Sequence, residues 1–265
     1  MGDLLRRRLM IVSKSEPATR FAFGTFTPES NLRSVTLPDL KGKNSFLIHP
    51  ISDITISNRV QYGGFTLRNQ CKFCRSTNTG KNAWSNKYTN NFSTGVASNS
   101  LSFNSSTGVV SILTGADING GGYFLAGVTY AYAGWIEDGT AQTGDFVTGH
   151  LTPASNSQTC TFSDLVGKNC FIVWKDQDSY SSSVSSHVMD IVYKDRLLTC
   201  AAVRTNGGWY LGDPSPFTAY GTGTNSQVTY TAATKTLKTT NTSYSNGRGY
   251  YVGGEPYYYA GWYVE

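Results

Sequence analysis

Residues 36–48, with the sequence TLPDLKGKNSFLI, return as residues 161–173, TFSDLVGKNCFIV, at an offset of 125 positions. The same offset, without a gap, relates residues 24–31, GTFTPESN, to residues 149–156, GHLTPASN. Two stretches that recur in the same order at one unchanged offset indicate that a whole unit of the chain is duplicated.

A second block lies toward the end of each unit. Residues 122–135, GYFLAGVTYAYAGW, recur as residues 249–262, GYYVGGEPYYYAGW, at an offset of 127. The period is far longer than the roughly 20 to 50 residues of a solenoid or propeller repeat, and it has the size of one globular domain. The chain is therefore predicted to hold two tandem homologous domains.

The blocks set the expected boundaries. Residues 1–20 form an N-terminal arm, residues 21–137 the first repeat, residues 138–145 a short polar linker and residues 146–265 the second repeat. The two copies differ most in their middle parts. In an all-β domain such stretches are loops or edge strands, where differences in binding collect.

The composition predicts an all-β fold. Charged residues make up 15% of the chain and hydrophobic residues 39%, and there are 28 Gly, 17 Tyr and 13 Phe. Aromatic and β-branched residues suit pleated strands, and Gly and Asn suit the turns between them. We expect two tandem β-sandwich domains of jelly-roll-like form behind a short helical arm.

Residues 1–12 are the segment for which a helix is predicted. Leu5, Leu9 and Val12 stand at positions i, i+4 and i+7, beside three arginines. So short a helix is not stable alone in water, and we expect it to become ordered against a partner chain. The alternative is a frayed start without a role. The candidate anchoring residues are Leu4, Leu5, Arg6, Arg7, Arg8 and Leu9.

The turn Gly-Lys-Asn before the central strand is retained in both copies, as Gly42 and Asn44 and as Gly167 and Asn169. Gly and Asn accept the positive φ of tight turns more readily than other residues. We therefore predict that backbone geometry explains why all four residues are retained. A phosphate-binding role is not expected, because no helix follows the turn.

The aromatic block at the end of each repeat has two interpretations. Its rings fill the core, or they form a surface for stacking on sugars or for contacts between subunits. Tyr258 lies on the opposite strand face from its neighbours and is expected to face solvent. The candidate contact residues are Tyr130, Tyr132, Trp135, Tyr257, Tyr258, Tyr259 and Trp262.

No catalytic arrangement emerges, and the chain is predicted to be non-enzymatic and without a cofactor. Asp39 and Asp164, the matched acids of the repeats, precede turns, which favours an Asx-turn or capping role. Glycoside hydrolysis needs a pair of carboxylates, and nothing in the sequence selects one. The acids that such a pair would draw on are Asp53, Asp176, Asp178 and Asp190.

The five cysteines are odd in number and are not duplicated with the repeat, which favours free thiols in a reducing compartment. Cys71 and Cys74 have zinc-knuckle spacing, but no second pair of ligands is near, so no metal is expected. Most of the net charge of +5 lies toward the N-terminus. Three adjacent arginines are too few to predict nucleic-acid binding.

No segment has the composition of a signal peptide or the length of a membrane span. We expect folding in the cytoplasm, without a membrane partner.

The opening MGDLLRRRLM, followed by a short tether and β domains rich in Gly, Ser, Thr and Tyr, resembles the N-termini of bacteriophage and prophage virion proteins. The likeness is to tail, fibre and head-decoration components of gut phages. It implies a virion structural protein that assembles in the host cytoplasm and binds other virion proteins through its arm. It also implies outward display of the β domains, often as a homotrimer, with host attachment as a role.

Two other function classes stay open. A tandem carbohydrate-binding protein would use the aromatic blocks to contact cell-surface glycans. A polysaccharide-degrading enzyme has the least support, because it needs a cleft lined by two acids.

Overall fold

The computed structural model describes residues 19–51, 62–76, 100–113, 124–175, 186–203, 209–212, 226–241 and 251–265. These residues form β-strands and two short 3-10 helices, and no α-helix occurs in these ranges. The fold is all-β with several antiparallel sheets, as the composition predicts. The helix predicted for residues 1–12 lies outside the described residues.

The strands of the first repeat form two sheets, a five-stranded sheet in the order β1-β8-β3-β4-β5 and a three-stranded sheet in the order β2-β7-β6. A 3-10 helix, η1 (Pro38–Leu40), precedes β3. The strand bounds are β1 Phe21–Phe26, β2 Ser34–Thr36, β3 Ser45–Pro50, β4 Tyr62–Leu67, β5 Gln70–Ser76, β6 Ser100–Asn104, β7 Val109–Leu113 and β8 Tyr130–Trp135.

The second repeat builds its sheets in the same order. Its large sheet reads β9-β17-β11-β12-β13, with β14 added at the far edge, and its small sheet reads β10-β16-β15. Helix η2 (Ser163–Leu165) occupies the place of η1. The strand bounds are β9 Phe146–Leu151, β10 Thr159–Thr161, β11 Cys170–Lys175, β12 Ser186–Tyr193, β13 Arg196–Val203, β14 Trp209–Gly212, β15 Ser226–Thr231, β16 Thr236–Asn241 and β17 Tyr257–Trp262.

Within each repeat the large sheet packs on the small one over an apolar core. In the first repeat, Leu40, Phe46, Val110 and Tyr130 are fully buried between the sheets. Their counterparts Leu165, Phe171, Leu237 and Tyr257 form the same layer in the second repeat. The two related stretches of sequence therefore lie in like surroundings.

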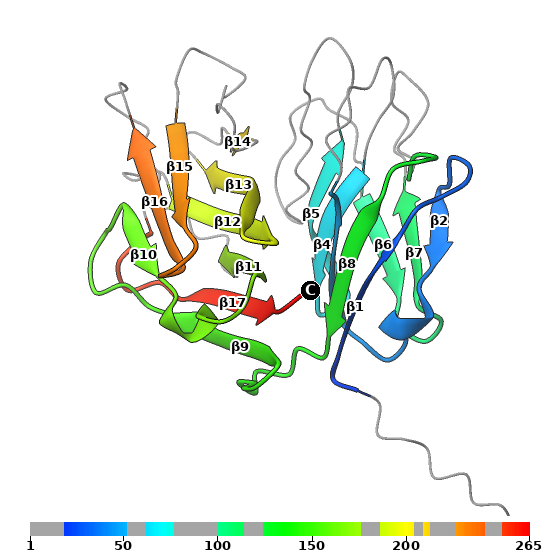
Figure 1. Cartoon of the computed structure of the whole chain (residues 1–265), viewed down its shortest axis with the longest axis horizontal. Coiled ribbons are helices and arrows are strands. Elements are labelled where there is room, and N and C mark those ends of the chain that lie inside the picture. The colour runs from blue at the N-terminus through cyan, green and yellow to red at the C-terminus, as the bar shows by residue number, and fades with distance from the viewer. Residues whose placement is uncertain are drawn as a thin grey trace, which may run out of the picture.

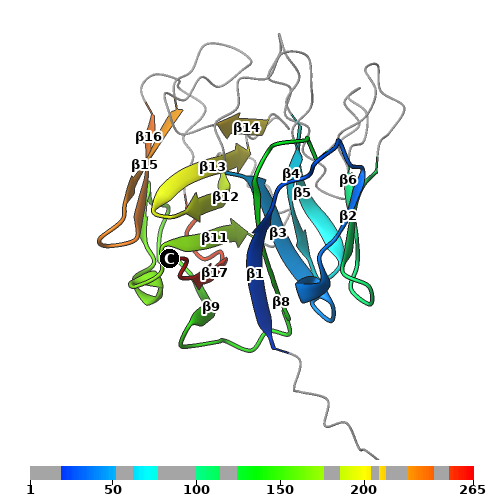
Figure 2. The same ribbon diagram turned by 45° about the vertical axis from the view of Figure 1, so that its right-hand side comes forward.

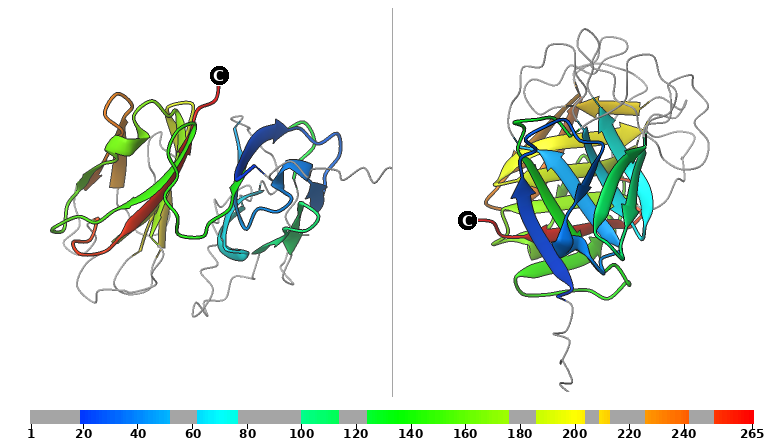
Figure 3. Two further views of the ribbon diagram at one scale, coloured as in Figure 1. Left: turned by 90° about the horizontal axis from the view of Figure 1, so that it is seen from below. Right: turned by 90° about the vertical axis from the view of Figure 1, so that its right-hand side faces the viewer.

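A third core joins the two repeats. The large sheets face each other in the middle of the molecule, and the small sheets lie on the outside (Figures 1 and 2). Their strands run across one another, and a single connection links the halves (Figure 3). The buried members of this shared core are Leu47, Phe65, Leu67, Ala133, Trp135, Phe146, Cys170, Ile172, Trp174, Met189, Ile191, Ala260 and Trp262.

The Gly and the Asn of the Gly-Lys-Asn turn are retained for two different reasons. The prediction from backbone geometry is right for the glycines and wrong for the asparagines. Gly42 and Gly167 have φ values of +79° and +86°, a region that favours glycine. Asn44 and Asn169 do not have positive φ. Their retention follows from the side chains, whose amides bind the chain after the aromatic block.

The large sheet of the first repeat has two distinct ends. Phe21, Trp135 and Ser45 are paired at the end where the arm enters. Phe26, Tyr130 and Pro50 are paired at the other end. In Figure 1, β1 begins at the lower end of its sheet and β5 finishes at the upper end. The strand ends that bound residues 52–61 and 77–99, where the copies diverge, therefore lie opposite the arm.

Candidate functional site: the junction of arm, first repeat and linker

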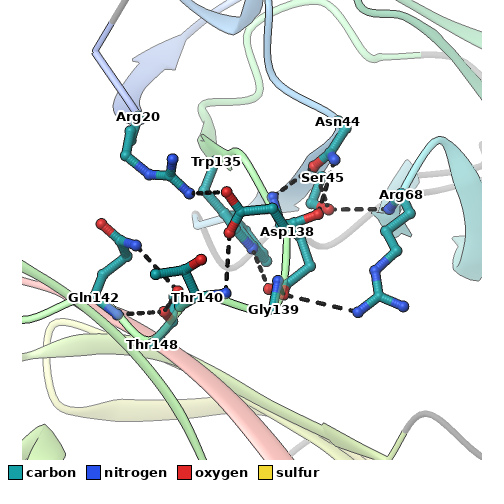
Figure 4. Close-up of polar contacts among 11 residues, drawn as sticks. Arg20, Asn44, Ser45, Arg68, Trp135, Asp138, Gly139, Thr140, Gln142 and Thr148 are labelled. Carbon is teal, nitrogen blue, oxygen red and sulfur yellow. Dashed lines mark hydrogen bonds and ion pairs between the residues drawn. The ribbon is translucent and has the colours of Figure 1, made fainter.

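Arg20 is held where the N-terminal arm joins the first strand. Its carbonyl oxygen accepts a hydrogen bond from the Ile136 N–H at 3.0 Å, which extends the pairing of β1 with β8. Its guanidinium Nη2 lies 2.6 Å from Asp138 Oδ2, and both side chains are about 40% exposed (Figure 4). The end of the arm is thereby tied to the beginning of the linker.

The Asp138 carboxylate is held in its charged form. The hydrogen bond from Arg20 lowers the pKa of Asp138 to about 2, and a hydrogen bond from the Thr140 N–H acts in the same direction. That N–H lies 3.0 Å from Oδ1. Because both side chains are exposed, solvent and salt weaken the ion pair of Arg20 with Asp138. Its main effect is to position the end of the arm beside the linker and not to stabilise the fold.

Asn44 fixes the chain just before Asp138. Its Nδ2 donates to the Glu137 carbonyl at 2.9 Å, and the Glu137 N–H donates to Asn44 Oδ1 at 2.7 Å. The Glu137 carboxylate accepts from Trp135 Nε1 at 3.3 Å and from the Gly139 N–H at 3.1 Å. The start of β3, the end of β8 and the linker therefore form one polar cluster, drawn in Figure 4.

The linker is ordered along the edge of β9. The Thr148 N–H donates to the Gln142 carbonyl at 3.1 Å, and the Gln142 N–H donates to Thr148 Oγ1 at 2.9 Å. The Gln142 side chain donates in turn to the Thr140 carbonyl at 3.0 Å. The outer edge of β9 is thus partly covered by the segment that precedes it.

Part of this junction belongs to the duplicated framework. Asn169 makes the same pair of hydrogen bonds with Val264 as Asn44 makes with Glu137. The ion pair does not recur, because Asp145 stands in the place of Arg20 and Glu265 in the place of Asp138. The link between Arg20 and Asp138 is therefore specific to the point where the arm enters.

The rings of the aromatic block lie mainly in the cores. Tyr130 and Tyr257 are fully buried, and each hydroxyl accepts a backbone N–H, from Leu125 and Val252 respectively. Tyr132, Trp135, Tyr259 and Trp262 are between 0% and 8% exposed. Rings in these positions present no face to a sugar.

Tyr258 is half-buried, although its strand position favours exposure. Its ring stacks on Trp174 with centroids 6.0 Å apart and lies 5.8 Å from the His150 ring. It belongs to the margin of the core between the repeats. The face of β17 that carries Tyr258 therefore borders the core that the two repeats share.

The matched acids Asp39 and Asp164 bind tyrosines of the aromatic block. Tyr132 donates its hydroxyl proton to Asp39 Oδ2 at 3.1 Å, and Tyr259 makes the equivalent bond to Asp164. Burial first, and then this hydrogen bond, raise the pKa of Tyr132 to about 12. The carboxylates hold the 3-10 helices against the large sheets, a role that the expected Asx turn does not include.

Of the acids considered for glycoside hydrolysis, Asp190 is the one that the structure describes. It is fully buried and accepts the Tyr251 hydroxyl at 3.0 Å. Asp53, Asp176 and Asp178 lie outside the described residues, as do the anchoring residues Leu4, Leu5, Arg6, Arg7, Arg8 and Leu9.

Within the described ranges, no three side chains of His, Cys, Asp or Glu are grouped so that they could hold a metal ion. No helix in the same ranges has the length and apolar character needed to cross a membrane. Comparisons with protein-family models, with curated proteins and with solved structures gave no match.

Sequence reasoning gave burial of the aromatic rings as one of two interpretations, but it missed the ion pair of Arg20 with Asp138 and the core between the halves that buries Trp135 and Trp262. The ion pair joins residues 118 positions apart. The one signal for it in the sequence is that opposite charges occupy these two positions in the first repeat and two acids occupy them in the second.

Proposed function

We propose that this chain is a non-enzymatic virion structural protein of a bacteriophage or prophage, anchored to the particle by residues 1–20. In this proposal the two repeats are jelly-roll-like β-sandwich domains that the particle displays outward. The partners of the arm are other virion proteins, and assembly takes place in the cytoplasm of the host cell. The observation that carries the proposal is the ion pair of Arg20 with Asp138.

The pairing of Arg20 supports an anchoring arm because it gives the arm a defined exit. Arg20 is the last residue before β1, and its link to Asp138 is absent from the equivalent place in the second repeat. The ion pair sets the position at which the arm leaves the first repeat, beside the start of the linker. A frayed start without a role would not need such a link.

The path of the chain supports the jelly-roll-like form. In the first repeat the chain passes from the large sheet in β1 to the small sheet in β2 and returns to the large sheet in β3. It crosses again from β7 to β8. Within the large sheet, β8 returns to lie beside β3, the first of the consecutive strands β3, β4 and β5, which is the strand order of a Greek key. Jelly rolls are built from two such Greek keys.

The direction of the strands supports outward display. The arm enters at one end of the first large sheet, and the strand ends that bound the divergent segments lie at the other. A particle that held the arm would leave the divergent end away from its surface. The same arrangement supports host attachment through that end as part of the proposal.

The test is to delete residues 1–12 and follow incorporation into purified particles by mass spectrometry. The truncated protein should keep the circular dichroism spectrum and melting temperature of the full chain and be lost from particles. A second variant replaces the same residues with Gly and Ser at unchanged length, which separates the side chains from the reach of the arm. Normal incorporation of both variants would refute anchoring.

Carbohydrate binding is tested separately on a glycan array. Tyr258 is the block member with a partly exposed ring, so Tyr258→Ala is the informative variant, with Trp262→Ala as the buried comparison. Specific binding that Tyr258→Ala abolishes would favour a carbohydrate-binding protein over a purely structural one.

A further inference from the structure

A cavity of about 190 Å³ lies between the two large sheets. The first repeat contributes residues in or next to β1, β3 and β8, and the second repeat contributes residues in or next to β12, β13 and β17. The lining includes Thr25, His49, Ala131, Tyr193, Trp262 and Val264.

The shared core shows that the two repeats face each other about an approximate two-fold axis. Phe21 and Phe146 occupy equivalent positions, and their rings stack on each other with centroids 4.1 Å apart. Trp135 lies 6.1 Å from Phe146, and its counterpart Trp262 lies 5.7 Å from Phe21. Reciprocal contacts of this kind are the mark of a two-fold interface, so each feature on one side has a counterpart on the other.

The counterpart of the cavity is filled. Thr25, His49 and Ala131 correspond to His150, Trp174 and Tyr258, which are all larger. Tyr258 lies between the other two, stacked on Trp174 at an interplanar angle of 22° and with its ring centroid 5.8 Å from that of His150. The cavity therefore exists because the first repeat carries three smaller residues where the second repeat carries aromatic rings.

The position equivalent to the cavity, on the other side of the two-fold axis, shows which chemical group the cavity can accept. Tyr258 extends a phenol ring from the position that Ala131 holds in the first repeat, and the ring is partly buried against the interface. An engineered apolar cavity of about 150 Å³ binds benzene, so a cavity of about 190 Å³ has room for one substituted ring.

The walls combine apolar surface with a few polar groups, as is usual for small-molecule sites. Trp262 and Tyr193 offer aromatic walls, and Ala131 and Val264 offer aliphatic ones. His49 Nδ1 lies 2.6 Å from the Pro50 carbonyl oxygen. Because a carbonyl oxygen only accepts, His49 Nδ1 carries the proton of this hydrogen bond.

We propose that the cavity between the repeats is a binding site for a small monocyclic aromatic molecule of phenol size. The ligand takes the place that Tyr258 fills on the other side of the two-fold axis. The inference rests on the packing of the repeats and is independent of the proposed virion role.

The test uses p-cresol, which is the tyrosine side chain as a free molecule, and the full-length protein. Binding is followed through the indole N–H signals in NMR spectra. In the unaltered protein, p-cresol should shift the Trp262 signal and leave Trp135 unaffected, with a dissociation constant of about 1 mM or lower. 4-Methylcyclohexanol, which has the same substituents on a puckered ring, should bind at least tenfold more weakly.

Two variants exploit the duplication. Ala131→Tyr introduces the residue of the second repeat and should weaken p-cresol binding at least tenfold, because the new ring fills the cavity. Tyr258→Ala should open the counterpart cavity, so that p-cresol also shifts the Trp135 signal. If one of the two variants does not fold, the other still tests the proposal.

The proposal is overturned if p-cresol does not shift Trp262 in the unaltered protein, or if folded Ala131→Tyr binds it with unchanged affinity. Equal binding of 4-methylcyclohexanol would overturn the assignment to aromatic ligands. A Tyr258→Ala protein in which Trp135 stays unaffected would overturn the argument from symmetry.

Discussion

Phe21 and Phe146 are separated by one repeat length in the sequence, and their rings stack face to face with centroids 4.1 Å apart and an interplanar angle of 11°. Two copies of one residue that meet in this way place the approximate two-fold axis of the molecule between them. The repeats are therefore joined as the subunits of a symmetric dimer would be, with a linker that makes the association intramolecular.

The shared core predicts that the halves stay together when the linker is cut. A protease recognition sequence inserted beside Gly144, an exposed linker position, would allow cleavage between the repeats. We expect the cleaved protein to elute as one species in size-exclusion chromatography, because the inter-repeat core contains three tryptophans. Trp174→Ala removes a large part of that core and should favour separation of the cleaved halves. If the cleaved protein without this substitution elutes as two separate fragments, the shared core is contradicted.

Removal of the Asn44 amide should destabilise the protein. Asn44→Ala leaves the Glu137 N–H and carbonyl without their side-chain partners, and Asn169→Ala does the same at Val264. We expect each change to lower the free energy of unfolding by about 1–3 kcal/mol. Urea denaturation measures it, with Ser30→Ala, at an exposed turn position, as a control expected within about 0.5 kcal/mol of the unaltered protein.

The Asp138 carboxyl should titrate at unusually low pH. Arg20 first, and then Thr140, lower its pKa from the ordinary 3.8 to about 2. The ion pair is therefore present above the ordinary value and is lost as the pH falls toward 2. In a 13C NMR titration, Arg20→Ala should raise the midpoint, although the Thr140 N–H keeps it below 3.8. An unchanged midpoint would show that the arm is not held at this place.

Two cysteine thiols should resist alkylation in the native protein. Cys160 and Cys170 are free and buried. Burial raises the pKa of Cys160 to about 12 and that of Cys170 to about 11. Because the thiolate is the reactive form, iodoacetamide at pH 8 should leave both unmodified until urea unfolds the chain. Peptide mass spectrometry checks the result, and rapid native labelling of either residue would contradict its burial.

The strands of the conserved blocks could be predicted because their signals are local. The Gly-Lys-Asn turn predicted where the central strand β3 starts. The positive φ at Gly42 and Gly167 follows from the same local rules. The role of Asn44 did not follow from them, because its partners are about ninety residues away in the chain.

The sequence by itself determined the duplication and the all-β class, because repetition and composition can be read along the chain. The tertiary structure alone decided that the two large sheets bury each other, that Arg20 meets Asp138 and that a cavity remains beside Ala131. Alternation shows that a strand has an apolar face without showing what covers it. An alanine in one copy and a tyrosine in the other define a cavity only after folding has brought both faces onto the same axis.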